Sequence, residues 1–122
     1  MKIPPTVVVA ILLLTGTLSG ASDLSGTWDL EMTFSNLTSA GTCVFRQDND
    51  ALSGTCGAGS DRFAITGTID GTTVSWAFSV KQDGAEGRME FTGEVDAPSM
   101  TITGSCRVVE GVDGTFTMRK RR

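Results

Sequence analysis

A short pattern of apolar and small polar residues recurs between residues 24 and 116. Each copy has an apolar residue, a serine or threonine, a glycine, a variable residue and a second apolar residue. The copies are LSGTW at 24–28, LSGTC at 52–56, ITGTI at 65–69, FTGEV at 91–95 and ITGSC at 102–106, with VDGTF at 112–116 as a near match. Alternation with a period of two is typical of β-strands, and the irregular spacing of the copies is unlike that of a solenoid. The glycine falls on the apolar face, where it permits sharp bending or leaves room for a large side chain opposite.

Extending these copies in both directions predicts eight strands and no amphipathic helix in residues 22–122. The strands are expected at 25–34, 41–47, 52–57, 62–69, 72–80, 87–95, 99–107 and 113–119. Because the connections are short, neighbouring strands should be antiparallel. A long meander with one apolar face hides that face and its two edges when it closes on itself. We therefore predict an all-β domain, an eight-stranded antiparallel up-and-down meander closed into a small barrel.

The strand register of one hairpin can be predicted from its turn residues. Asp70-Gly71 is a favoured two-residue turn, and it pairs Ile69 with Thr72. Gly67 then lies opposite Val74. A slip of one residue would turn every apolar side chain of the hairpin to the wrong face.

A second hairpin brings two of the three cysteines together. With a loop over Asp48–Ala51, Cys43 lies directly opposite Cys56, close enough for a bridge. Exported chains meet oxidising conditions, so we expect a Cys43–Cys56 disulfide. Cys106 lies on a distant strand and is expected to remain as a buried, unreactive thiol.

The alternation sends one set of side chains to the inside of the barrel, and none of them is ionisable. The inward set is Trp28, Leu30, Met32, Phe34, Cys43, Phe45, Leu52, Cys56, Phe63, Ile65, Ile69, Val74, Trp76, Phe78, Met89, Phe91, Val95, Met100, Ile102, Cys106, Phe116 and Met118. Two interpretations of this lumen remain open: a core filled by its aromatic and methionine side chains, which we favour, or a small cavity for an apolar ligand. The residues that would line such a cavity are Leu30, Met32, Phe45, Phe63, Ile65, Trp76, Phe78, Phe91, Ile102 and Phe116.

The first 21 residues differ from the rest of the chain. Lys2 precedes a mostly apolar, uncharged run at 6–18, and Ser19-Gly20-Ala21 supplies the small residues that a signal peptidase reads. The run is short for a membrane span, which makes an uncleaved anchor the weaker alternative. The sequence thus predicts a signal peptide at 1–21, a barrel domain at 22–118 and a basic C-terminal tail at 119–122. The mature protein would be periplasmic or extracellular, with no membrane contact after cleavage.

Charge and composition narrow the possible functions. The predicted domain 22–118 contains five basic and 14 acidic residues, a formal charge of −9, which argues against a nucleic-acid surface. The chain has no histidine and no convergent polar cluster, so we expect no enzymatic activity, no catalytic residues, no metal and no cofactor. Asp48-Asn49-Asp50 offers too few oxygens for calcium and is better explained as a turn.

Several motifs follow one another in an order seen in a known group of proteins. GTW at 26–28 precedes LSGT at 52–55, GTIDGTTVSW at 67–76, FTG at 91–93 and MTITG at 100–104. The chain resembles the calycin-type small barrels of the lipocalin, fatty-acid-binding and avidin superfamily. It is similar, more closely, to exported bacterial lipocalin-like domains without an assigned activity. The resemblance implies that Trp28 closes one barrel end with the basic side chain of Arg119 lying across it. Biotin binding is not implied, because the chain has no tyrosine and no tryptophan after residue 76.

Two functions fit these observations. The first is a non-enzymatic exported barrel that binds a small apolar ligand in its lumen. The alternative is a protein-binding module, such as an inhibitor of a secreted hydrolase, which would make contact through Ser22–Ser25 and the loop Phe34–Gly41. The sequence identifies neither the ligand nor the partner.

Overall fold

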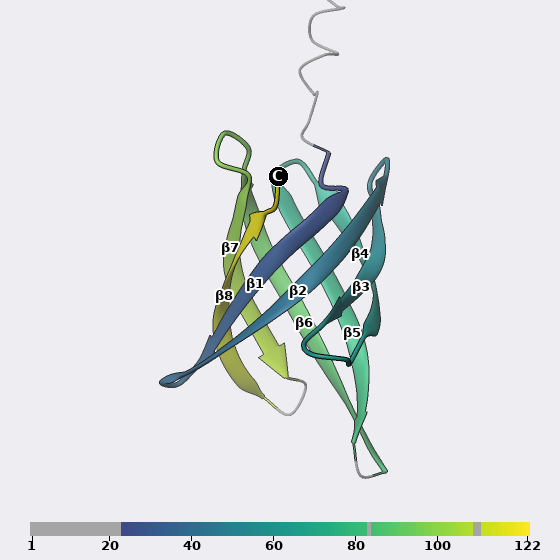
Figure 1. The fold of residues 1–122 in the computed structure, drawn as a ribbon, viewed down its shortest axis with the longest axis vertical. Coiled ribbons are helices and arrows are strands. Elements are labelled where there is room, and N and C mark those ends of the chain that lie inside the picture. Colours follow the sequence, from purple (N-terminus) through teal and green to yellow (C-terminus); the bar gives the residue numbers. More distant parts are fainter. Residues whose placement is uncertain (1–22, 83, 109–110) are drawn as a thin grey trace, which may run out of the picture.

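Eight strands follow one another along the chain and form the wall of a barrel (Figure 1). The computed structural model describes residues 23–82, 84–108 and 111–122, so the predicted signal peptide lies outside the described residues. The strands are β1 (Gly26–Phe34), β2 (Leu37–Asp48), β3 (Ala51–Gly57), β4 (Phe63–Asp70), β5 (Thr73–Gln82), β6 (Ala85–Asp96), β7 (Thr101–Val108) and β8 (Val112–Lys120).

Every strand pairs with its neighbours in the sequence, and β1 also pairs with β8. All these pairings are antiparallel, and the strand order β1 to β8 forms a closed barrel. The predicted fold class is therefore confirmed. Along each strand of the closed barrel, side chains point alternately into the lumen and out to solvent. The pairing of β1 with β8 removes the two free edges that an open sheet would have.

Two of the predicted strand limits are wrong in a way that affects the candidate site. Residues 37–40, expected in a loop, belong to β2 and pair with the end of β1, where Phe34 faces Leu37. Phe34–Gly41 is thus a tight hairpin around Ser35, whose φ is +58°. At the other end of the chain, β8 continues to Lys120, so the first two residues of the predicted basic tail lie in the barrel wall.

The predicted register of the β2–β3 hairpin is confirmed, whereas that of the β4–β5 hairpin is wrong by two residues. Ile69 pairs with Val74 instead of Thr72, and Gly67 lies opposite Trp76. The turn is formed by Gly71, whose φ is +66°, and the residue after it. A two-residue shift keeps every side chain on its predicted face, so the composition of the lumen is unchanged.

Gly67 explains why this register is preferred. A Cβ at this position would overlap the Ser75 carbonyl oxygen and lie 2.7 Å from the Trp76 Cβ. Only a glycine lets β4 and β5 approach so closely beside the indole. Packing of the tryptophan therefore decides a register that the turn residues alone leave open.

The core runs through the whole lumen. Its buried side chains are Leu24, Trp28, Leu30, Cys43, Phe45, Leu52, Cys56, Ile65, Val74, Trp76, Phe91, Ile102, Cys106, Phe116 and Met118. Within the described part of the chain, no buried side chain is polar or charged. We call the end of the barrel where β1 begins the Leu24 end, and the end where β1 finishes the Phe34 end.

Candidate functional site

The middle of the lumen is filled by a cluster of aromatic rings. Trp76 of β5 stacks on Phe91 of β6, with ring centroids 4.9 Å apart and an angle of 5° between the planes. Phe45 and Phe116 make edge contacts with the same indole at 5.1 and 5.3 Å. Such contacts add to the hydrophobic free energy of burying the rings. The structure therefore favours the filled interpretation for this middle layer.

The Leu24 end is closed by hydrogen bonds around a buried leucine. Trp28 Nε1 donates to the Leu24 carbonyl oxygen at 2.9 Å, and the Leu24 N–H donates to Gln47 Oε1 at 2.8 Å. The Gln47 N–H in turn donates to Ser25 Oγ at 2.9 Å. Leu24 is only 1% exposed although it precedes the first strand. Leu24 is absent from the predicted inward set, and its only signal in the sequence is its place as the first apolar residue of the LSGTW copy.

Apolar side chains at the Phe34 end are only partly buried. They are Met32, Phe34, Phe63, Phe78 and Met89. Phe63 stacks on Phe78 at 5.2 Å, and Phe78 approaches Phe91 at 5.9 Å. The rings Phe63, Phe78, Phe91 and Trp76 thus form a continuous series of contacts from the partly exposed Phe34 end to the packed middle of the lumen.

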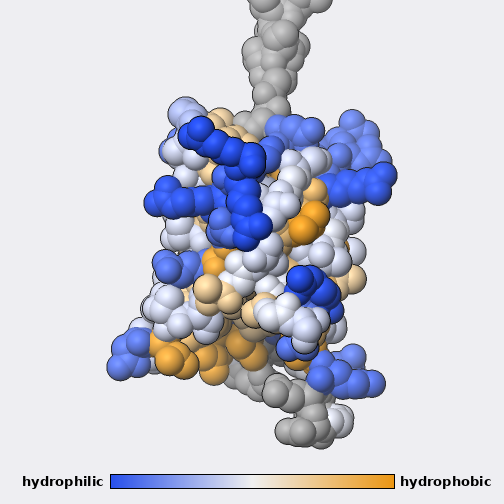
Figure 2. Space-filling view, viewed as in Figure 1, coloured by the Kyte–Doolittle hydropathy of each residue, from blue (hydrophilic) through white to orange (hydrophobic). Residues whose placement is uncertain are grey.

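The surface reflects this difference between the two ends. Figure 2 shows hydrophobic surface gathered along the lower rim of the molecule, at the Phe34 end, and strongly hydrophilic side chains mainly in the upper half. Leu37 and Val112, which are 70% and 52% exposed, belong to strand ends at this rim.

Seven of the ten predicted lumen residues are buried: Leu30, Phe45, Ile65, Trp76, Phe91, Ile102 and Phe116. The other three, Met32, Phe63 and Phe78, lie at the Phe34 end and are partly exposed. The structure therefore brings the predicted set together in one lumen and divides it into a packed middle layer and an accessible end.

Trp76 has a further property that its sequence position did not reveal. Its side chain is buried, yet Nε1 has no hydrogen-bond partner in the structure. Trp28, the other tryptophan, has its indole N–H satisfied by Leu24. A buried donor without a partner is rare in folded proteins, because its lost hydration is not replaced.

The pairing of Trp28 with Arg119, which the family resemblance implied, is wrong. Arg119 lies opposite Asp29 on the outer face, and Lys120 lies opposite Trp28. Lys120 passes beside Gly26 and its Nζ donates to the Asp23 carbonyl oxygen at 3.2 Å. Side chains alternate along β8, so the extension of that strand to Lys120 places the second basic residue, not the first, at the Leu24 end.

The C-terminal tail folds back onto the acidic body of the barrel. Arg121 donates from Nε and Nη2 to Asp29 Oδ1 at 2.9 and 2.7 Å. These hydrogen bonds lower the pKa of Asp29 and raise that of Arg121. Both side chains are about half exposed, so the pair positions the tail and adds little stability.

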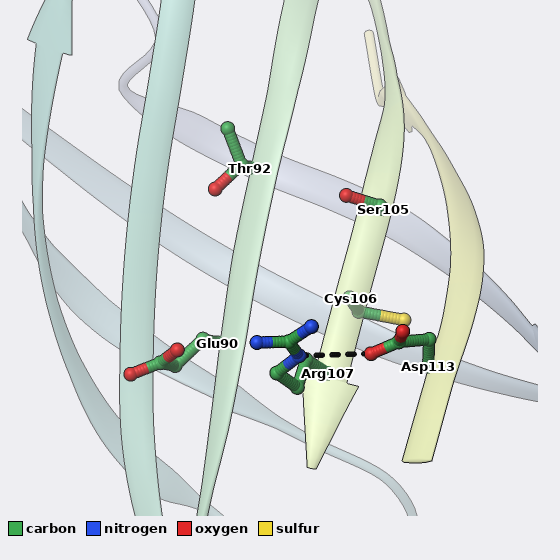
Figure 3. Close-up of a pocket in the computed structure, with 6 residues that line it drawn as sticks. All are labelled: Glu90, Thr92, Ser105, Cys106, Arg107 and Asp113. Carbon is green, nitrogen blue, oxygen red and sulfur yellow. Dashed lines mark hydrogen bonds and ion pairs between the residues drawn. The ribbon is translucent and has the colours of Figure 1, made fainter. Parts of the chain in front are cut away.

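A shallow pocket of about 260 Å³ lies on the outer face of β6, β7 and β8 (Figure 3). Arg107 Nε donates to Asp113 Oδ1 at 2.9 Å, which raises the pKa of Arg107 and lowers that of Asp113. Glu90, on the neighbouring strand, pairs with Arg88 at 3.1 Å. Each charged group of this pocket already has a partner, because Arg107 and Asp113 pair with each other and Glu90 pairs with Arg88 outside the lining, and all are well exposed. The pocket lacks the buried polar groups that binding sites use to fix a ligand.

The three cysteines occupy the predicted states. Cys43 and Cys56 form a disulfide across directly paired positions of β2 and β3. Cys106 is free and buried, and its pKa is raised by burial and then by the charge of Asp113. A thiol in this environment stays protonated at neutral pH and is a poor nucleophile. No set of three or more histidine, cysteine, aspartate or glutamate side chains in the described part of the chain could hold a metal ion.

Comparison with known proteins identifies the fold and no more. No family model matches the chain, and no curated protein matches it. Among solved structures it is similar to a redesigned β-barrel, with 19% sequence identity and a TM-score of 0.64. The match covers 81% of this chain and 92% of the redesigned one. None of the residues that the structure describes forms a helix long and apolar enough to cross a membrane.

Proposed function

We propose that this chain is a non-enzymatic, exported, lipocalin-like barrel that binds a small apolar ligand through the Phe34 end of its lumen. The observation that carries the proposal is the pair of stacked, partly exposed rings Phe63 and Phe78 at the Phe34 end. Partly exposed side chains also occur at the Leu24 end, where they are Ile69, Val95 and Met100, but hydrogen bonds around the buried Leu24 cover the lumen there. Pockets for small ligands are concave, largely apolar sites with access to solvent.

Two further features support export and a binding role. The Cys43–Cys56 disulfide is the kind of bond that persists in an oxidising compartment, as expected behind a signal peptide at 1–21. The chain has no histidine, and the lumen side chains are all apolar. Such a lumen favours ligand binding by hydrophobic burial over acid–base chemistry.

The first test is titration of the purified protein with a neutral hydrophobic dye such as Nile red. We expect saturable fluorescence enhancement, and at least tenfold weaker binding in the variant Phe63→Glu. The substituted carboxylate would stand at the Phe34 end and lose hydration when the dye enters. Val44→Ser is the matched control, because Val44 is 47% exposed on the outer face of β2. Absence of dye uptake, or equal weakening by both variants, would contradict the proposal.

A second candidate function, binding of a partner protein, is favoured by the β1–β2 hairpin. Residues 37–40 are exposed on both faces of β2, and Leu37 is 70% exposed at the tip. Figure 1 shows this hairpin projecting from the lower left of the barrel. An exposed apolar tip on a rigid hairpin is suited to insertion into a cleft of another protein.

The inhibitor form of this second function predicts loss of activity in a target enzyme. Secreted proteases and glycosidases would be assayed with increasing amounts of the purified chain. If the hairpin is the contact, Leu37→Asp should abolish inhibition and Val44→Ser should preserve it, because only Leu37 lies at the tip. No inhibition of any enzyme by the unmodified chain would remove this candidate.

A further inference from the structure

The first residues of β2 have a strand beside them on one side only. They pair with β1, but the pairing of β2 with β3 ends where Thr42 lies opposite Gly57. Residues 37–41 therefore extend beyond the end of β3, as part of the hairpin that projects from the barrel in Figure 1. We call the open side of residues 37–41 the free β2 edge.

Two residues of the free β2 edge direct their backbone groups away from β1. In an antiparallel ladder, successive residues turn their N–H and C=O groups to opposite sides, and the residues that flank a two-residue turn bond to each other. Phe34 and Leu37 flank such a turn, so the backbone groups of Thr38 and Ala40 point to the open side. Among the described residues, no backbone hydrogen bond outside the strand ladders reaches Thr38 or Ala40.

The free β2 edge lacks the features that usually keep exposed strand edges apart. Natural proteins place charged residues, prolines or bulges on such edges. β5 also continues beyond the end of its pairing with β4, but that segment contains Lys81. Residues 32–45 contain no charged residue and no proline, and the β1–β2 register has no bulge. An edge of this kind favours pairing with another strand.

We infer that the free β2 edge pairs with the same edge of a second copy of this chain. The two strands would run antiparallel about a twofold axis at Ser39, so that Thr38 of each copy lies opposite Ala40 of the other. These are the residues with open backbone groups, so one register gives all of those groups a partner on both copies. A contact that uses the same patch on both copies closes as a dimer.

The side chains fit the same register. Leu37 is 70% exposed, and it would lie opposite Gly41 of the second copy. A large apolar side chain opposite a glycine is the arrangement that recurs within the barrel wall. The pairs in the wall are Phe45 with Gly54, Trp76 with Gly67 and Phe116 with Gly104.

Charge favours this edge over the rest of the surface as the contact between copies. The chain has a formal net charge of −4, so most approaches of two copies bring like charges together. The uncharged residues 32–45 avoid this repulsion. The contact covers only five residues on each copy, so the dimer should be weak and should depend on protein concentration.

Disulfide trapping tests the register. Ser39 would face Ser39 of the second copy in a pair without backbone hydrogen bonds, where Cβ atoms come closest. Ser39→Cys should therefore shift from the mass of one chain to that of two under mild oxidation, as measured by non-reducing electrophoresis. Ser79→Cys is the matched control, because Ser79 is an exposed serine beyond the end of the β4–β5 pairing, and it should remain a single chain.

The second test measures association without a cross-link. Sedimentation equilibrium of the unmodified protein should show a dimer that dissociates on dilution. Ala40→Pro removes an N–H that faces the open side, so it costs no hydrogen bond within the chain. It should weaken dimerisation about tenfold, because each dimer loses two hydrogen bonds. Ser79→Pro should leave dimerisation unchanged.

The outcomes decide the inference without reference to ligand binding in the lumen. A single-chain mass at every concentration, together with no cross-link in Ser39→Cys, would overturn it. Equal cross-linking of Ser39→Cys and Ser79→Cys, or equal weakening by the two proline variants, would show that the free β2 edge is not the contact. If circular dichroism shows that Ala40→Pro does not fold, the comparison of the two cysteine variants decides alone. A chain that stays monomeric and binds an unrelated extended peptide at this edge would also overturn pairing with a second copy.

Discussion

Gly67→Ala is expected to destabilise the barrel by about 3 kcal/mol, near the upper end of the usual cost of overpacking. The added methyl group would overlap the Ser75 carbonyl oxygen and press on the Trp76 Cβ. Neither atom can move without shifting β5, because Ser75 and Trp76 are held in the ladder between β4 and β6. Urea denaturation should show a lower midpoint with an unchanged slope.

Gly87→Ala provides the matched control. Gly87 is also a strand glycine, but the nearest atom to its Cβ would be the Val80 carbonyl oxygen at 4.0 Å. Its replacement should change stability by less than about 0.5 kcal/mol, with any gain arising from reduced freedom of the unfolded chain. Equal effects at the two positions would show that close approach of β4 and β5 is not the reason for the glycine.

The glycines of the repeated pattern have the role in the barrel that the sequence predicted for them. At Gly93, a Cβ would lie 2.9 Å from the Phe116 Cζ, and at Gly104 it would lie 2.5 Å from the Gly93 Cα. These positions make room for a large ring or for a neighbouring strand, as the glycine on the apolar face indicated. The period of two located all eight strands, because burial of one face depends only on alternation.

The predictions that were wrong concern details that the alternation of apolar and polar residues does not determine. The β4–β5 register can shift by two residues without moving any side chain to another face, so only the fit of Trp76 against Gly67 selects it. The basic residue at the Leu24 end was misassigned because the resemblance implied Arg119, whereas Met118 points inward and alternation therefore turns Arg119 outward and places Lys120 opposite Trp28. Strand ends are set by the pairing partner, which a local pattern does not contain.

The candidate site was predicted in composition but not in function. Inward positions identified its apolar side chains, because polarity and alternation are local properties of the sequence. The unpaired state of Trp76 Nε1 depends on the residues of β2, β4, β6 and β8 that surround the indole. The same applies to Leu24, whose burial arises from hydrogen bonds to Trp28 and Gln47.

Loss of the Cys43–Cys56 bridge is the other change with a large expected effect. The two cysteines are 13 residues apart, and closing a loop of this length restricts the unfolded chain by about 3 kcal/mol. Domains of this size are stable by roughly 5–15 kcal/mol, so the double variant Cys43→Ala, Cys56→Ala should still fold. Its melting temperature should fall by roughly 10–20 °C.

The barrel should survive because the bridge joins two strands that are already neighbours. β2 and β3 pair over seven positions from Thr42 to Asp48, and β2 also pairs with β1 along nine residues.

Thermal unfolding followed by circular dichroism would measure the effect, with Cys106→Ala as the control that changes packing but leaves the bridge intact. Thiol counting in denaturant should find one free thiol in the unmodified protein, and peptide mapping should place it at Cys106. A bridge that includes Cys106, or a double variant without a folded baseline, would mean that the β2–β3 pairing does not hold the hairpin as described.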